Sequence, residues 1–202
     1  MKKFVLLNLI VIAFAACGNA RTPESAGGKP AHLAVATFSG GCFWCMEKPF
    51  DQTAGVVDTT SGYTGGDVVR PSYEEVSGGG TGHRESERVT YDPTKVSYEQ
   101  LLDVYWHNVD PFDAGGQFCD RGSQYTTAIW YHDENQRRLA EASKQRIEQK
   151  FGKKVYTAIL PAGAFYPAED YHQNFYQKNP IRYEFYRHGC GRDRRLEEIW
   201  GK

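Results

Sequence analysis

Stretches of alternating apolar and polar residues along this chain predict short strands. The stretch 33–38 has the period of two that a half-buried strand requires. The same reasoning predicts further strands, which are bounded by glycine, proline or polar residues typical of turns, over 56–63, 86–91, 126–131 and 155–160. Since these stretches are short, each is expected to form one strand of a small sheet.

Capping residues indicate where helices begin. Ser97 is followed three positions later by Gln100, the spacing of a capping box, and the apolar face that follows predicts a helix to residue 107. Asp133 has the side chain of an N-cap and precedes a long polar helix that is predicted to run to residue 150. A short helix is predicted over 168–176.

The order of these elements predicts the fold class. Strands and helices alternate irregularly, which is typical of an α+β two-layer sandwich with helices packed on a mixed or antiparallel sheet. A long glycine-containing loop over 110–124 interrupts the order, and loops of that length are more often functional than not. The charged segment 178–202 has weak periodicity, so we expect a mobile C-terminal tail.

The N-terminus predicts an exported protein. Residues 1–17 combine two lysines, an apolar stretch and small residues before Cys17, as in a signal peptide with a lipoprotein processing box. Ordinary cleavage nearby and a retained hydrophobic tail are the alternatives. Residues 18–31 predict a flexible tether and 32–202 a single domain. We therefore expect a bacterial lipoprotein of the periplasm or cell envelope, in contact with the membrane only through its lipid anchor.

Composition and charge exclude some classes of function. The chain has 202 residues, of which 40% are hydrophobic and 24% charged, which suits one globular domain. The net charge of -1 comes from mixed acidic and basic residues, so nucleic acid is not an expected partner. The many aromatic residues, 13 Tyr, 11 Phe and 4 Trp, fit either an ordinary core or an apolar binding pocket.

Cys42 is the strongest candidate for chemistry. It follows Gly40-Gly41 at the predicted start of a helix, where the helix dipole and backbone N–H groups stabilise a thiolate. The alternative is a buried structural cysteine. Cys45 completes a C-x-x-C pair that permits a disulfide or shared redox work, but the β-α-β start and the proline of a thioredoxin-like motif are not evident. A metal site is not expected, because no second C-x-x-C or close histidine pair is present.

Six motifs together resemble those of the A-type peptide-methionine sulfoxide reductases. In chain order they are Gly41-Cys42-Phe43-Trp44-Cys45-Met46-Glu47, Gly62-Tyr63-Thr64-Gly65-Gly66, Pro71-Ser72-Tyr73-Glu74-Glu75-Val76, Thr81-Gly82-His83-Arg84-Glu85, Tyr91-Asp92-Pro93 and Asp120-Arg121-Gly122-Ser123-Gln124-Tyr125. The likeness covers residues 33 to 180, with Arg84 and Cys119 as departures from the family pattern. The resemblance implies a ferredoxin-like plait and reduction of the S epimer of methionine sulfoxide, free or in proteins.

The resemblance also implies a role for each residue of a catalytic set. Cys42 is the nucleophile that attacks the sulfoxide sulfur, and Glu85 is the acid that protonates the departing oxygen. A carboxyl in an aromatic pocket has a raised pKa, which suits a proton donor. The alternative is that Glu85 is a solvated carboxylate at the edge of a strand. Tyr73 and Tyr125 match phenols that donate hydrogen bonds to the sulfoxide oxygen, although core tyrosines are the alternative.

Three further residues are assigned to substrate binding. Phe43 and Trp44 are expected to form an apolar wall for the S-methyl group, or equally to anchor the helix to the core. Asp120 matches a position close to the substrate backbone in the family. Phe43 and Trp44 are assigned from their position directly after Cys42, and Asp120 from the resemblance.

The oxidised nucleophile must be recycled by another thiol. Cys190, between two glycines in the predicted tail, matches a recycling cysteine of similar family members and is expected to form a disulfide with the Cys42 sulfenic acid. Cys45 is the alternative, although an i,i+3 pair on a helix is geometrically demanding. A thioredoxin-type or other dithiol reductant then reopens the bond, with no organic cofactor or metal, and the chain is expected to be a monomer.

Two rival functions stay open at this stage. A periplasmic thiol-disulfide oxidoreductase would use Cys42 and Cys45. A non-catalytic surface lipoprotein would bind apolar peptides through its aromatic side chains.

Overall fold

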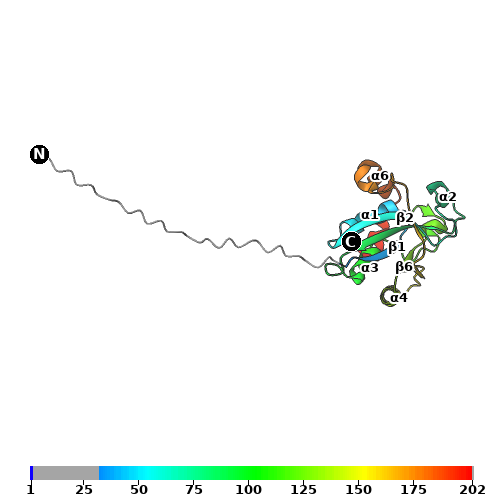
Figure 1. The fold of residues 1–202 in the computed structure, drawn as a ribbon. Helices are drawn as coiled ribbons and strands as arrows, with labels where there is room; N and C mark the ends of the chain where they lie inside the picture. Colours follow the sequence, from blue (N-terminus) through cyan, green and yellow to red (C-terminus); the bar gives the residue numbers. More distant parts are fainter. Residues whose placement is uncertain (2–31, 202) are drawn as a thin grey trace. The chain divides into compact units, whose positions relative to one another are not determined.

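The domain is built on a six-stranded sheet with the order β7-β6-β1-β3-β2-β8. The structure is a computed structural model, which describes residue 1 and residues 32–201 (Figure 1). The strands of the sheet are β1 (Ala34–Ser39), β2 (Val56–Thr64), β3 (Arg84–Tyr91), β6 (Ala128–Tyr131), β7 (Ala158–Pro161) and β8 (Phe165–Pro167). The predicted signal peptide with Cys17, and nearly all of the tether, lie outside the described residues.

The strand pairing is mostly antiparallel. The central strand β1 pairs antiparallel with β3 and β6, and β2 pairs antiparallel with β3 and β8. Among the paired strands of the described residues, only β6 and β7 run parallel. The sheet is therefore mixed, as the order of the elements predicts.

Seven helices surround the sheet in the described residues. They are α1 (Phe43–Asp51), α2 (Tyr73–Ser77), α3 (Tyr98–Trp106), α4 (Glu134–Phe151), α5 (Phe175–Lys178), α6 (Pro180–Gly189) and α7 (Arg192–Trp200). Both predicted caps are confirmed. Ser97 and Gln100 form a reciprocal capping box at α3, and the Asp133 carboxylate accepts a hydrogen bond from the Gln136 N–H, 2.8 Å away, at the start of α4.

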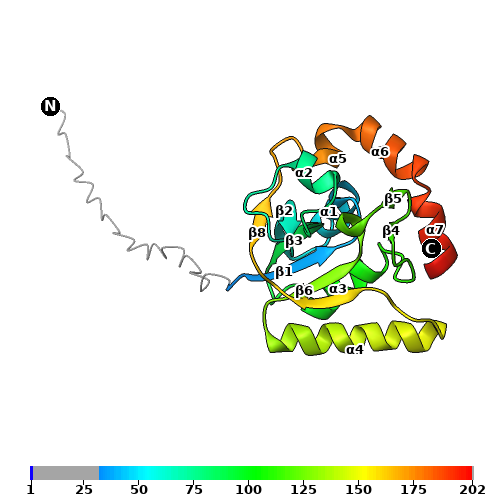
Figure 2. The same cartoon turned by 90° about the vertical axis from the view of Figure 1, so that its right-hand side faces the viewer.

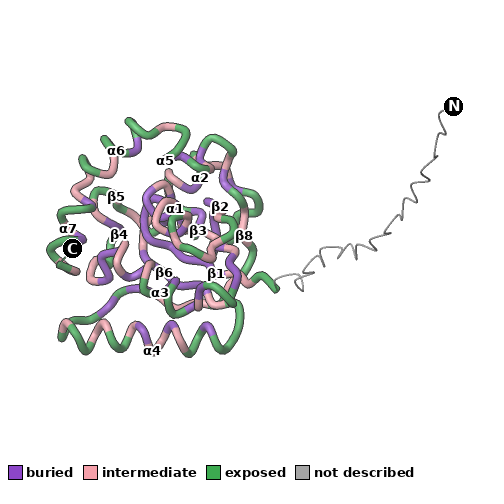
Figure 3. Tube along the Cα trace, turned by 90° about the vertical axis from the view of Figure 1, so that its left-hand side faces the viewer, coloured by how far each residue is buried: buried purple, intermediate pink, exposed green. Residues whose placement is uncertain are grey.

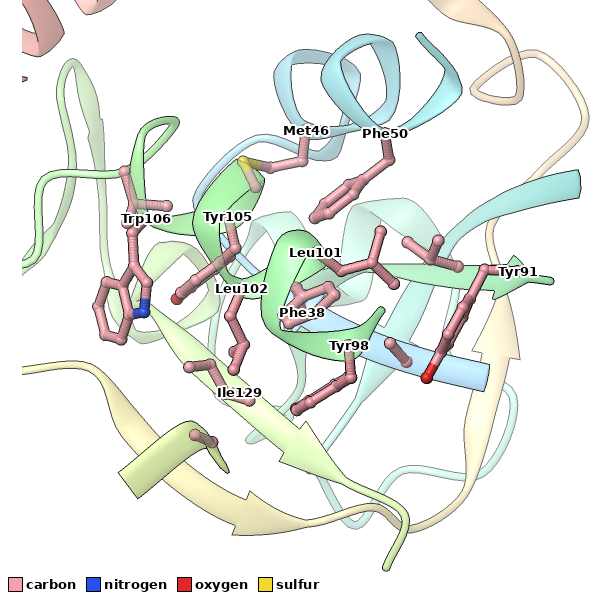
Figure 4. Packing of buried hydrophobic residues seen from close by; sticks show 14 of the residues in the cluster. Phe38, Met46, Phe50, Tyr91, Tyr98, Leu101, Leu102, Tyr105, Trp106 and Ile129 are labelled. Carbon is pink, nitrogen blue, oxygen red and sulfur yellow. The ribbon is translucent and has the colours of Figure 1, made fainter. Parts of the chain in front are cut away.

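The main core lies between one face of the sheet and helices α1, α3 and α4. Phe38 of β1 is fully buried, and its ring centroid lies 5.0 Å from that of Phe50 and 5.1 Å from that of Tyr105 (Figure 4). Burial follows this arrangement, since the centre of the sheet is buried while α4 exposes its outer side (Figure 3). The two-layer α+β architecture is confirmed.

Several local elements differ from the sequence-based expectations. The short strand β8 and the short helix α2 are not predicted by any periodic pattern. The expected helix over 168–176 is found only as α5, while Tyr171 and His172 lie in a turn. The loop 110–124 contains two short paired strands, β4 (Gly116–Gln117) and β5 (Asp120–Arg121).

The C-terminal segment is helical as far as Trp200, and one buried arginine ties it to the core. Arg192 is 1% exposed, and its guanidinium donates hydrogen bonds to the carbonyl oxygens of Gly40 and Asn108, both at 2.8 Å. Figure 2 shows α6 and α7 following one another along the outer side of the domain. The mobility expected for this segment stays a prediction. Of the helices formed by the described residues, none has the length and apolar character needed to cross a membrane.

Candidate active site

Cys42 lies at the turn between β1 and α1. Gly41 before it has a φ of +81°, and a Cβ atom there would lie 2.6 Å from the Gln117 Cβ, so both conformation and space require glycine. Cys42 itself is the N-cap of α1 and is 6% exposed. The predicted position of this thiol at a helix N-terminus is confirmed.

A cavity of about 500 Å³ opens above this thiol. It gathers the residues that the sequence singles out for catalysis and binding, with Cys45 as the exception. The lining includes Cys42, Phe43, Trp44, Tyr73, Glu85, Asp120, Tyr125 and Cys190. Cys45 is 1% exposed and lies against Phe175 and Tyr183. The roles assigned to these residues stay predictions, but the structure brings them to one place.

Glu85 is placed to act on a group bound next to Cys42. Its side chain is 1% exposed, and one carboxylate oxygen accepts a hydrogen bond from the Phe43 N–H at 3.0 Å. Burial raises the pKa of Glu85 to about 8, against the opposing effect of that hydrogen bond. At neutral pH the carboxyl is therefore mostly protonated and can donate a proton.

The two thiols of the C-x-x-C pair differ in acidity. Burial is the main reason why the pKa of Cys42 is raised well above its usual range, and a hydrogen bond with Cys45 and the charge of Glu85 add to the rise. The same hydrogen bond lowers the pKa of Cys45 to about 6, helped by the nearby cation Arg192 and opposed by burial. Burial therefore opposes the stabilisation that the helix end gives to a Cys42 thiolate. Because the two thiols share a hydrogen bond, the negative charge belongs to the pair, and the position of the shared proton decides which sulfur carries it.

Tyr73 and Tyr125 supply two phenols to the cavity. Burial raises the pKa of Tyr73 to about 12 and also raises that of Tyr125. Both hydroxyls therefore stay protonated at working pH and can donate hydrogen bonds to an oxygen in the cavity.

The Tyr73 backbone is held by a carboxylate that the sequence does not single out. Glu169 accepts hydrogen bonds from the Tyr73 N–H and from the Tyr63 hydroxyl, both at 2.9 Å. This contact fixes the start of helix α2 beside the cavity.

Phe43 and Trp44 line the cavity and also anchor α1, so the structure brings them where both of their predicted roles require. The Trp44 ring stacks on Phe175 with centroids 3.7 Å apart, and its indole N–H donates to His172 Nδ1 at 2.9 Å. Burial lowers the pKa of His172 to about 4, so this imidazole stays neutral and can accept that hydrogen bond.

Helix α6 adds residues that sequence reasoning missed. The Tyr186 hydroxyl donates a hydrogen bond of 2.6 Å to Asp120, and burial raises the pKa of this carboxyl. Arg182 and Phe185 also line the cavity. No motif pointed to these three residues, because the segment that carries them has only weak periodicity.

Cys190, the predicted recycling cysteine, is found in a disulfide. Cys119 and Cys190 are bonded, with their Cα atoms 4.9 Å apart, while Cys42 and Cys45 are free. Both bonded cysteines line the cavity, and Cys119 is exposed. Asp120 also has a ligand atom within 4.8 Å of their sulfurs, but in this state the sulfurs are bonded to each other rather than available to a metal.

Comparison with known proteins gives a consistent result. The family model described as peptide methionine sulfoxide reductase matches residues 34–202. Peptide methionine sulfoxide reductase MsrA of Bacillus licheniformis is 52% identical over 170 residues, which cover 83% of this chain and 94% of that protein.

Solved structures agree with this result. Mxr1 from Saccharomyces cerevisiae in reduced form superposes with a TM-score of 0.71 and 31% identity, covering 76% of this chain and 89% of that one. This yeast protein has also been solved in complex with Trx2. Methionine sulfoxide reductase A of Corynebacterium diphtheriae gives a TM-score of 0.67 and 34% identity, covering 76% and 78%. The chain belongs to the peptide methionine sulfoxide reductase family.

Proposed function

We propose that the Cys42 cavity reduces the S epimer of methionine sulfoxide, free or in proteins, to methionine. Family membership supports the reaction. The observation that carries the mechanism is the position of Glu85, a buried and mostly protonated acid whose carboxylate meets the backbone N–H of the residue after Cys42. Proton donor and nucleophile therefore face the same cavity.

The first step transfers the sulfoxide oxygen to the enzyme. Cys42 attacks the sulfoxide sulfur as a thiolate, with the proton of the pair held by Cys45, while Glu85 protonates the oxygen, because an unprotonated oxide is a very poor leaving group. The hydroxyls of Tyr73 and Tyr125 donate hydrogen bonds to that oxygen as charge builds on it. Methionine leaves, and Cys42 holds the oxygen as a sulfenic acid.

Recycling uses the thiols at the edge of the cavity. The Cys190 thiol condenses with the Cys42 sulfenic acid, forms a Cys42–Cys190 disulfide and releases water. The Cys119 thiolate then attacks the Cys190 sulfur, releases Cys42 as a thiolate and forms the disulfide seen in the structure. Cys45 is the alternative resolving thiol.

An external dithiol completes the cycle. It reduces the Cys119–Cys190 bond by thiol-disulfide exchange and becomes oxidised itself. The exposure of Cys119 and the complex of yeast Mxr1 with Trx2 support a reductant of the thioredoxin type.

Replacing Glu85 by glutamine tests the mechanism. Glu85→Gln should lower the rate of sulfoxide reduction about 100-fold or more, because the proton donor is lost. Glu87→Gln is the matched control, since Glu87 is a buried carboxyl on the same strand that does not line the cavity. A thiol-disulfide oxidoreductase that uses Cys42 and Cys45 would keep its activity in both variants, and retained sulfoxide turnover in Glu85→Gln would contradict the mechanism.

The identity of the resolving thiol has its own test. After one turnover without reductant, Cys190→Ser should accumulate sulfenic acid on Cys42, measured by trapping and mass spectrometry. Normal recycling by thioredoxin in this variant would instead assign the role to Cys45 or Cys119. Methionine formed in this single turnover also excludes a pure peptide-binding protein.

We further propose export and lipidation at Cys17. The composition of residues 1–17 supports this, and the family domain begins only at residue 34. Mass spectrometry of the mature N-terminus from a bacterial host should find an acylated Cys17; an unprocessed Met1 would contradict the proposal.

A further inference from the structure

Helix α6 exposes two large apolar side chains on its outer face. Ile181 is 87% exposed and Phe185 is 81% exposed. They are four residues apart and therefore lie one above the other on the same side of the helix. Tyr183 on the inner side is 1% exposed and packs near Cys45, so the helix is already anchored to the domain without them. Because Ile181 and Phe185 are exposed, packing in the core does not explain why these two positions are apolar.

A groove beside this pair continues from the Cys42 cavity. It has a volume of about 490 Å³ and is lined by Lys178, Asn179, Pro180, Ile181, Arg182 and Phe185. Arg182 and Phe185 line the Cys42 cavity as well. When an oxidised methionine of a polypeptide substrate lies in the cavity, the substrate residues on either side of it are therefore near the groove.

The charged residues of the groove are both cations. Lys178 and Arg182 are lining residues, and no carboxylate from residues 32–201 lines the groove. The Arg182 guanidinium lies 5.7 Å from the ring centroid of Trp44, on the wall of the cavity. Arg182 has no ion pair among residues 32–201, so it is available to an acidic group of a ligand.

The position of the groove favours the substrate over the reductant as its occupant. Cys190 follows the C-terminal end of α6, whereas Ile181 lies in its first turn, roughly 13 Å away along the helix axis at the usual rise. Neither Cys119 nor Cys190 lines the groove. The groove and the disulfide are therefore at opposite ends of α6.

We propose that the groove is a subsite for oxidised polypeptides, which holds residues next to the methionine sulfoxide. An apolar side chain packs on Ile181 and Phe185, and an acidic side chain pairs with Arg182 or Lys178. This proposal rests on the proposed function and adds a preference among protein substrates.

The test compares peptides with a small substrate. Three probes are used: N-acetylmethionine S-sulfoxide, a hexapeptide with the sulfoxide between leucine and glutamate, and a hexapeptide with it between serine and lysine. The wild-type enzyme should prefer the leucine and glutamate peptide. Ile181→Ser should lower kcat/KM for that peptide about fivefold, which corresponds to the partial loss of one apolar contact, and should change the small substrate less than twofold. Val57→Ser is the control, because Val57 is 58% exposed on β2 and lines neither the groove nor the cavity.

Each other outcome has a defined meaning. Equal kcat/KM for both peptides in the wild-type enzyme overturns the subsite. A raised KM for thioredoxin in Ile181→Ser, with peptide turnover unchanged, assigns the groove to the reductant and also overturns it. If the wild-type enzyme does not reduce the small substrate, the proposed function itself fails, which is distinct from failure of the subsite.

Discussion

The raised pKa of Glu85, the proposed catalytic acid, predicts that this residue destabilises the folded enzyme at neutral pH. The pKa is 4.5 in the unfolded reference and about 8 in the fold. Between these values the unfolded chain has lost a proton that the folded chain still holds, so stability falls as pH rises. The loss is about 1.4 kcal/mol per pH unit while the two states differ by one proton.

Glu85→Gln removes this dependence while keeping a side-chain oxygen that can accept the hydrogen bond from Phe43. Relative to the wild type, the free energy of unfolding of the variant should therefore rise by about 2 kcal/mol between pH 5 and pH 7. Other titrating groups, including Glu47 with its pKa raised by burial to about 7, contribute equally to both proteins and cancel in the difference.

The assay is urea unfolding followed by tryptophan fluorescence at pH 5, 6 and 7, with both proteins oxidised so that the disulfide is the same. A difference between variant and wild type that stays constant over this range would refute the reasoning, because it would mean that Glu85 titrates alike in the folded and unfolded chain.

Three further predictions concern activity, anchoring and recycling. The single-turnover rate of the wild-type enzyme should fall as pH rises through about 8, because Glu85 then loses the proton that it donates; stopped-flow measurements should show no such fall in Glu85→Gln. Arg192→Met should lower the free energy of unfolding by about 2 kcal/mol, since two buried carbonyls lose a charged donor, and an unchanged urea midpoint would argue against this anchor. Cys119→Ser should leave a Cys42–Cys190 disulfide after turnover without reductant, which peptide mapping should find. This variant should form one methionine per chain, where the wild type forms two.

The sequence predicts the site well where the signal is local or carried by a motif. Ser97 and Gln100 lie within one helical turn, so their capping box needs no tertiary information. Cys42 after two glycines likewise predicts its own turn and helix end. The motifs around Tyr73 and Glu85 come together in the cavity because β3 and helix α2 both border it.

What the sequence does not predict depends on contacts between distant segments. The pairing of Cys119 with Cys190 joins residues separated by 71 positions, and four thiols allow three pairings. Arg192 has the composition of a surface residue, yet it is 1% exposed because three acceptors meet at its guanidinium. Tyr186 contributes to the cavity from a helix whose apolar positions are too few to show a clear period.

The disulfide at the edge of the cavity also has a consequence for heat resistance. It closes a long loop between Cys119 and Cys190, with a sequence separation of 71, and thereby restricts the unfolded chain by about 4 kcal/mol in the chain-entropy treatment. For a domain of this size that corresponds to a melting temperature about 10 °C higher in the oxidised enzyme than in the reduced one. The supply of reductant therefore affects the thermal stability of this enzyme as well as its turnover rate. Molecules that have not yet been reduced have the higher melting temperature.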